Sequence, residues 1–152
     1  MVLPRLASEH VRSVLGVSPV VVVMGARQTG KSTLVQTLPA LQGIPYLTLD
    51  DLDVRDQARV APEDLVRRAP RLVLDEVQRE ADLVLAIKRA VDEQRPRVRG
   101  RFVLTGSANL LLMKRISETL AGRASYVTLW PMTRREQLGL GTAGIWSEFF
   151  RW

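Results

Sequence analysis

The sequence predicts an α/β fold in which helices cover both faces of a parallel β-sheet. Unbroken apolar, β-branched runs, such as PVVVV at 19–23, are typical of parallel strands, because such strands are buried on both faces. Segments with helical spacing alternate with these runs, and this alternation favours a parallel sheet. The chain has 152 residues, 46% of them hydrophobic, so we expect one domain with a core of Val, Leu and Ala.

Five apolar runs are the expected strands. In chain order they are SPVVVVM (18–24), IPYLTLDD (44–51), RLVLDE (71–76), RFVLTGS (101–107) and ASYVTLWPM (124–132). The first is the most strongly β-branched, and the second and third end in acidic residues.

Helical segments are expected between these strands. In chain order they are 5–15, KSTLVQTL (31–38), APEDLVRRA (61–69), EADLVLAIKRAVDEQ (80–94) and NLLLMKRISETLAG (109–122), of which the last could be broken in its middle. Pro39 helps to end the second helix. Pro62, with the acidic Glu63 and Asp64 behind it, favours the start of the third. After Met132 the sequence predicts a loop and then a helical turn or two.

The composition limits the classes of partner. The net charge is +6 and the isoelectric point about 10.7. This balance favours a nucleic acid or a nucleotide, although a codon preference for Arg over Lys would give the same excess. Cysteine is absent, which excludes disulfides and a Cys nucleophile and agrees with a reducing cytoplasm. No segment has the roughly 18 apolar residues of a membrane span, and the start does not resemble a signal peptide. We therefore expect a cytoplasmic protein without membrane contact.

A phosphate-binding loop is predicted between the first strand and the helix that follows it. GARQTGKS fits the pattern G-x-x-x-x-G-K-[ST], in which the glycines let the loop amides turn towards an anion. Lys31 would reach the β- and γ-phosphates, and the Ser32 hydroxyl would ligate Mg²⁺. A glycine turn with a chance lysine is the alternative, but the flanking strand and helix argue against it. The predicted binding residues are Gly25, Ala26, Arg27, Gln28, Thr29, Gly30, Lys31, Ser32 and Thr33.

Two acidic residues end the third predicted strand. Ligands bind at the carboxyl edge of an open parallel sheet, which is where Asp75 and Glu76 are expected. Asp75 could hold Mg²⁺, directly or through water, and Glu76 could deprotonate the attacking water. The alternative is a strand that merely ends in two exposed acids.

Small polar residues end the fourth predicted strand. A hydroxyl or amide of Ser107, Thr105 or Asn109 could contact the γ-phosphate or the water that attacks it, and Ser107 is the leading candidate. Capping of the next helix by Ser107 or Asn109 is the competing interpretation.

Together these three elements resemble the AAA-type branch of P-loop ATPases. More narrowly, they are similar to a bacterial and archaeal group of AAA-like ATPases that usually carry a C-terminal domain of unknown function. The matching stretches lie between about Val20 and Glu136, and they are GARQTGKSTL, LDEVQ, AIKRAVDE, FVLTGSANLLLMKRISETLAGR and LWPMTRRE. The resemblance implies a three-layer P-loop NTPase sandwich with strand order 5-1-4-3-2 and ATP as the ligand. It also implies catalytic or metal-binding roles for Lys31, Ser32, Asp75 and Glu76.

The same resemblance points to Arg123 in the stretch LAGR. An arginine can stabilise charge on the transferring phosphoryl group, in cis or from a neighbouring subunit. Arg123 could act in this way or lie on the surface at the end of a helix. Arg27 is a second basic candidate near the phosphates. Ala26 stands where the family often has Pro, and we expect this difference to be harmless because the position presents its backbone.

We expect three parts along the chain. Residues 1–19 form an N-terminal helical lead-in, residues 20–132 the P-loop ATPase core, and residues 133–152 a short C-terminal tail. Members of the resembled group usually continue well beyond this point, so the tail is expected to begin a region that the chain lacks. A lid and a second sensor arginine would belong to that region, which makes weak turnover an expectation.

The main functional hypothesis is a Mg²⁺-dependent ATPase that converts ATP to ADP and phosphate to drive a conformational change. One alternative is a nucleotide-gated binding module with little turnover, and another is a homo-oligomer that shares its nucleotide site between subunits. A nucleic-acid track formed by alternate arginines is less favoured, because no aromatic residues lie between them; these arginines are Arg95, Arg97, Arg99 and Arg101. Small-molecule kinase activity is the least favoured hypothesis, because a glutamate that activates water suits hydrolysis.

Overall fold

The computed structural model describes residues 5–94, 96, 98–107 and 110–139. Five strands form one sheet: β1 (Val20–Gly25), β2 (Tyr46–Thr48), β3 (Leu72–Asp75), β4 (Phe102–Ser107) and β5 (Ala124–Thr128). The order is β2-β3-β4-β1-β5 and every neighbouring pair is parallel. This confirms the expected strand order 5-1-4-3-2 and the three-layer P-loop NTPase sandwich.

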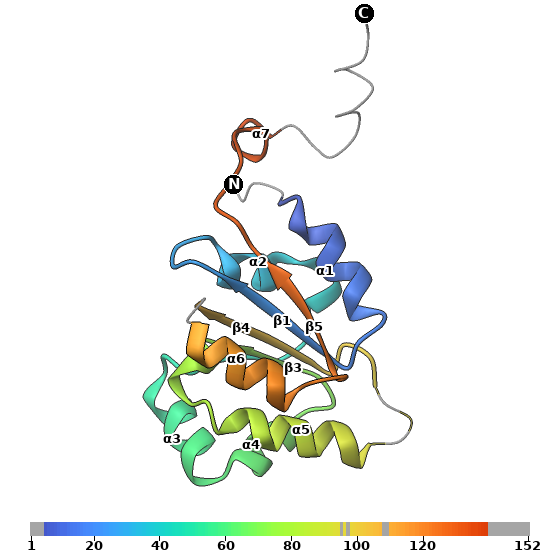
Figure 1. The fold of residues 1–152 in the computed structure, drawn as a ribbon, viewed down its shortest axis with the longest axis vertical. Helices are drawn as coiled ribbons and strands as arrows, with labels where there is room; N and C mark the ends of the chain where they lie inside the picture. Colours follow the sequence, from blue (N-terminus) through green and yellow to red (C-terminus); the bar gives the residue numbers. More distant parts are fainter. Residues whose placement is uncertain (1–4, 95, 97, 108–109, 140–152) are drawn as a thin grey trace, which may run out of the picture.

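Helices cover both faces of the sheet (Figure 1). One face is covered by α1 (Ala7–Leu15), α2 (Lys31–Thr37) and the 3₁₀ turn η1 (Pro39–Leu41). The other is covered by α3 (Leu52–Val60), α4 (Pro62–Arg67), α5 (Leu83–Glu93) and α6 (Leu110–Thr119). A 3₁₀ turn η2 (Val77–Arg79) follows β3, and α7 (Arg134–Gln137) follows β5.

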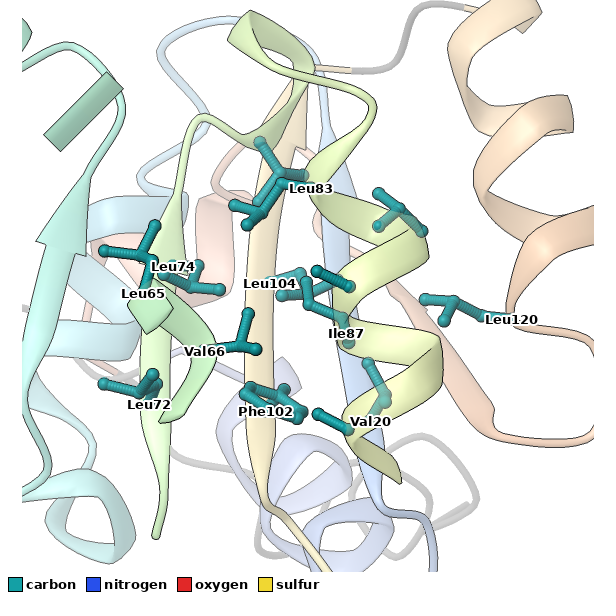
Figure 2. Close-up of a cluster of buried hydrophobic side chains, with 14 of the residues drawn as sticks. Val20, Leu65, Val66, Leu72, Leu74, Leu83, Ile87, Phe102, Leu104 and Leu120 are labelled. Carbon is teal, nitrogen blue, oxygen red and sulfur yellow. The ribbon is translucent and has the colours of Figure 1, made fainter. Parts of the chain in front are cut away.

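The valine run of β1 suits its interior position, between β4 and β5. Val20 and Val22 belong to the hydrophobic cluster under α3–α6, whereas Val21 and Val23 belong to the cluster under α1 and α2. Successive side chains of a strand point to opposite faces, so a strand covered on both sides needs apolar residues at every position. Figure 2 shows the larger cluster, in which Phe102 and Leu104 of β4 pack against Ile87 of α5.

Several elements differ from the expectation. The helix α3 was not expected, because only Ala58 of its residues is buried and the segment has little apolar periodicity. Its N-cap is Asp51, whose side chain accepts hydrogen bonds from the backbone N–H groups of Asp53 and Val54. The strand β2 is shorter than the stretch 44–51, and α6 continues without a break from Leu110 to Thr119.

The helix α1, near the start of the described chain, packs on the core. Val11 and Leu15 of α1 are buried against the sheet, and α7 follows β5 after a short loop. The division into a lead-in, a core and a tail stays a prediction, and residues 140–152 lie outside the described part. Within the described residues, no helix has both the length and the apolar character needed to cross a membrane.

Candidate nucleotide-binding site

The predicted phosphate-binding loop connects β1 to α2 at the carboxyl edge of the sheet. Gly25 allows close contact there, because a Cβ atom at this position would lie 2.3 Å from the carbonyl oxygen of Leu129. Gly30 has a φ angle of +85°, in the left-handed region that glycine adopts at little cost. The two glycines of the motif therefore have separate structural reasons, a close backbone approach and a left-handed turn.

A pocket of about 690 Å³ opens above this loop, within the range typical of ligand sites. Its lining residues are Arg27, Gln28, Gly30, Lys31, Ser32, Thr33 and Glu76. Gln28 and Glu76 are the non-glycine residues with a positive φ among the described residues, at 62° and 57°. Such backbone strain costs about 1–3 kcal/mol per residue and clusters at ligand sites. Both strained residues line the same pocket.

The Lys31 side chain is buried and turned back on its own loop. Its Nζ atom donates to the carbonyl oxygens of Ala26, at 2.8 Å, and Gly25, at 3.2 Å. Thr29 donates to the same Ala26 carbonyl through its hydroxyl, at 3.0 Å. A hydrogen bond from an ammonium group to an anionic phosphate is stronger than one to a neutral carbonyl. A bound phosphate can therefore replace these two carbonyls as the partner of Lys31.

Asp75 is buried at the end of β3 and accepts two hydroxyl groups. Thr105 donates to its Oδ1 atom and Tyr46 to its Oδ2 atom. Burial raises the pKa of the Tyr46 phenol, and its hydrogen bond to Asp75 raises it further, while contacts with the side chains of Ser32 and Gln36 act in the opposite direction. The Tyr46 hydroxyl therefore lies near both of the predicted metal ligands, Asp75 and Ser32.

Glu76 reaches the pocket because the chain turns sharply after Asp75. Its left-handed backbone begins η2, and its N–H donates to the Thr105 hydroxyl at 3.3 Å. Gln78 donates through Nε2 to the Glu76 carboxylate and, at 3.3 Å, to Ser107 Oγ. The Ser107 N–H donates to Gln78 Oε1 at 3.2 Å. Gln78 thus joins the predicted general base to the predicted sensor.

The structure brings most of the predicted site residues together. Arg27 and Thr33 are exposed in the pocket wall, and Asp75 lies beneath it with Thr105. Ser107 contacts the site through Gln78 and does not line the pocket. Asn109 lies outside the described residues. Tyr46 and Gln78 were not predicted, because an apolar strand and a 3₁₀ turn carry no sequence signal for a polar contact with Asp75 or Glu76.

Arg123 lies at the opposite edge of the sheet. It precedes Ala124, which pairs with Val20 at the amino end of β1, whereas the loop begins at Gly25. Five residue steps of strand separate the two places by roughly 17 Å. Arg123 donates from Nε and Nη2 to the two carboxylate oxygens of Asp92, at 2.7 and 2.8 Å, which raises its pKa. The structure does not bring Arg123 to the phosphate-binding loop of its own chain.

Among the arginines that precede β4, those that the structure describes donate hydrogen bonds to backbone carbonyls. Arg99 donates to the carbonyl oxygen of Gly16 at 3.2 Å, and Arg101 donates to that of Ala90. Arg95 and Arg97 lie outside the described residues. Two of the four arginines of the predicted track are thus already engaged with backbone carbonyls, so the described part gives that hypothesis no support.

Comparison with known proteins places the chain in a family. Residues 17–138 match the family described as the AAA domain. The chain belongs to this family. This chain is 33% identical over 144 residues to uncharacterized proteins of Mycobacterium tuberculosis and Mycobacterium bovis. Each match covers 93% of this chain and 32% of the relative, so the chain spans about a third of the length of these curated relatives.

Solved structures, one of them of a Walker-type ATPase, share the fold of this chain. The Walker-type ATPase of Pyrococcus abyssi is similar with a TM-score of 0.59 and 13% identity, over 91% of this chain and 57% of that one. AMPPCP-bound DnaA from Aquifex aeolicus is similar with a TM-score of 0.57 and 16% identity, over 85% and 48% of the two chains. At these identities the likeness shows the fold alone, which is that of an AAA-type P-loop ATPase domain.

Proposed function

We propose that the chain binds ATP with Mg²⁺ at the carboxyl edge of its sheet and hydrolyses it to ADP and phosphate. The observation that best supports this is the pocket in which the P-loop lysine, the P-loop serine and a strand-end glutamate meet. Membership of the AAA-domain family agrees with it. The finer statements below, on residues, metal and turnover, are proposals.

Phosphate binding would begin with the release of Lys31. Its ammonium group would leave the carbonyls of Gly25 and Ala26 for the β- and γ-phosphates, since an anionic acceptor makes a stronger hydrogen bond. The loop amides from Ala26 to Thr33 would surround the β-phosphate, and Arg27 at the exposed rim would add positive charge.

The residues present fit Mg²⁺. Magnesium prefers oxygen ligands and is usually held by one or two protein oxygens together with phosphates and waters. The Ser32 hydroxyl lines the pocket, and the two hydroxyl bonds to Asp75 hold its carboxylate in one orientation. We propose that Ser32 ligates the ion and that Asp75 accepts hydrogen bonds from its waters. When bound, the ion supplies charge neutralisation at the phosphate oxygens.

Hydrolysis would depend on Glu76. Its carboxylate would take a proton from water while the water oxygen attacks the γ-phosphorus and the bond to the β-phosphate oxygen breaks. In the structure the carboxylate is bonded to Gln78, which also contacts Ser107. Ser107 would thereby be coupled to the γ-phosphate through the side chain of Gln78.

A nucleotide-gated binding module with little turnover is the second candidate. It is favoured by the position of Arg123, which is paired with Asp92 at the far edge and supplies no positive charge to the pocket of its own chain. A site shared in a homo-oligomer, with Arg123 acting from a neighbouring subunit, would restore that charge. We also propose a cytoplasmic location.

The experiment that tests the proposal is ATP hydrolysis measured over a range of protein concentrations. Wild type is compared with Lys31→Ala and Glu76→Gln, and binding of a non-hydrolysable ATP analogue is measured alongside. Specific activity that rises with concentration and disappears in both variants supports a shared catalytic site. Tight binding of the analogue without turnover at any concentration supports the binding module. No binding of the analogue by wild type would contradict both.

A further inference from the structure

A single arginine at the start of the described chain links three separate segments. Arg5 donates from Nε to Oε1 of Glu136 at 3.0 Å, from Nη1 to the carbonyl oxygen of Thr29 at 2.6 Å, and from Nη2 to that of Trp130 at 2.7 Å. Thr29 belongs to the phosphate-binding loop, Trp130 follows β5, and Glu136 belongs to α7. Figure 1 shows the start of α1 and α7 on the same side of the molecule.

Glu136, the ion-pair partner of Arg5, is buried and accepts several hydrogen bonds. It is 4% exposed and accepts from the N–H groups of Leu6 and Thr133, each at 2.8 Å, in addition to Arg5. Burial by itself raises the pKa of this carboxyl, but the hydrogen bonds from Thr133, Leu6 and Arg5 outweigh burial and lower it to about 2. The carboxylate is therefore ionised at neutral pH, and Arg5, at 8% exposure, is its buried counter-ion.

The bond to the Thr29 carbonyl bears on ligand binding. The peptide unit between Thr29 and Gly30 is planar, so its C=O and N–H groups point in opposite directions. Arg5 holds the C=O group, and this fixes the direction of the Gly30 N–H, one of the loop amides that would contact phosphate. Gly30 has a φ angle of +85° and the wide conformational freedom of glycine. Without the hydrogen bond from Arg5, the Thr29–Gly30 peptide would therefore rotate more freely than its neighbours.

We propose that Arg5 and Glu136 are positioning residues of the phosphate-binding loop, and that they make nucleotide affinity depend on the placement of α7. This inference rests on the proposed nucleotide binding. Displacing α7 removes Glu136 from Arg5, the guanidinium loses its buried counter-ion, and the Thr29–Gly30 peptide loses its donor. Regulation of the loop from the C-terminal side then follows without any contact between α7 and the ligand.

The first test measures the affinity for a non-hydrolysable ATP analogue with Mg²⁺ by calorimetry. Arg5→Gln and Glu136→Gln should each weaken binding about tenfold, the net worth of roughly one hydrogen bond. The double variant should be no weaker than the worse single variant, because both break the same link. Arg5→Lys keeps the charge and replaces Arg5→Gln if the latter does not fold.

The matched control is Val11→Ala, at a buried position of α1 whose apolar side chain has no hydrogen bond to donate to the loop. It should lower stability and leave the affinity unchanged. An equal loss of affinity in Val11→Ala, or unchanged affinity in folded Arg5 and Glu136 variants, would overturn the inference and leave the pair a purely structural contact.

The second test uses reciprocity, because two coupled sites must affect each other equally. The analogue should slow amide hydrogen exchange in α7 of wild type, and this protection should be absent in Arg5→Gln. If wild type binds no nucleotide, the proposed function fails and the dependence of affinity on α7 fails with it, but the positioning of the Thr29–Gly30 peptide by Arg5 keeps its own test. Faster exchange at Gly30 in ligand-free Arg5→Gln than in Val11→Ala supports that positioning, and equal exchange refutes it.

Discussion

The two edges of the parallel sheet use their polar side chains in different ways. At the carboxyl edge, Glu76 and Lys31 line a pocket and Asp75 is buried next to Glu76. Their hydrogen bonds go to hydroxyls, an amide and loop carbonyls that a ligand can replace. At the amino edge, Arg101 and Arg123 are bonded to a backbone carbonyl and to Asp92. Charged residues are present at both edges, and at the carboxyl edge they meet a pocket and two residues with a strained backbone, Gln28 and Glu76.

This difference shows why the net charge of a chain and its number of arginines are poor guides to the position of an anion-binding site. The chain carries a net charge of +6, and arginines are frequent at the amino edge. An arginine that already has a fixed partner gains little from a new anion, since the old bond must first be broken. The lysine of the loop is different, because its present partners are neutral carbonyls. The predictions below compare the effects of substitutions at the carboxyl edge with those at the amino edge.

The largest effect is expected for Glu76→Gln. If Glu76 is the general base, the variant should hydrolyse ATP about 10²–10⁴ times more slowly than wild type. Binding of an ATP analogue should be retained, because the amide keeps the size and the backbone is unchanged. The comparison is made by phosphate release under saturating ATP. Unchanged phosphate release in a pure sample would exclude this role.

Lys31→Ala should come next and act on binding. Loss of a charged hydrogen-bond donor costs about 1.5–3 kcal/mol, which weakens affinity roughly 10- to 150-fold. Calorimetric titration with an ATP analogue measures this, with Arg99→Ala at the amino edge as the control. Equal losses in the two variants would mean that the edges do not differ.

A third prediction concerns acid stability. The pKa of Glu136 is about 2 in the folded chain, below the ordinary value of 4.5, so its ionised form stabilises the fold. This contribution is fully present above pH 4.5 and is lost as the pH falls from there towards 2. Urea unfolding of wild type should become easier over this interval. In Glu136→Gln that part of the pH dependence should be smaller, and an identical dependence would contradict the assignment.

The smallest effect is expected for Arg123→Ala. Its pair with Asp92 is partly exposed, so its loss should lower the stability only slightly. Analogue binding at low protein concentration should be unchanged, because Arg123 lies at the other edge. A drop in specific activity that is seen only at high concentration would indicate a role in a neighbouring subunit. A drop in binding by the dilute chain would refute its placement.

Much of this fold was accessible from the sequence because the interior strands β1, β3 and β4 are buried on both faces. Such strands need apolar residues at every position, and the run at Val20–Val23 shows that pattern directly. The helix α3 was missed because only one of its residues is buried, although Asp51 is a typical N-cap. The spacing of Thr133 and Glu136 is likewise a capping-box signature, and the structure shows that box at the start of α7.

The site was predictable only where the chemistry depends on neighbours in the sequence. The loop motif fixes glycine, lysine and serine within eight residues, and Asp75 with Glu76 ends a recognisable strand. Tyr46 and Gln78 join the site through tertiary contacts, and Arg5 meets Glu136 across 131 residues of chain. No local pattern encodes such a contact. Arg123 illustrates the reverse case, because its position at the amino edge does not support a role in the pocket of its own chain, while a role in a neighbouring subunit stays a prediction.

The most direct test is amide hydrogen exchange of wild type with and without a non-hydrolysable ATP analogue and Mg²⁺. The account predicts that the ligand slows exchange in the loop 25–33 and around 75–78, at the carboxyl edge. Exchange around 99–101 and 123–124, at the amino edge, should not change. Absence of protection at the loop, or protection confined to the amino edge, would contradict the assignment of the nucleotide site.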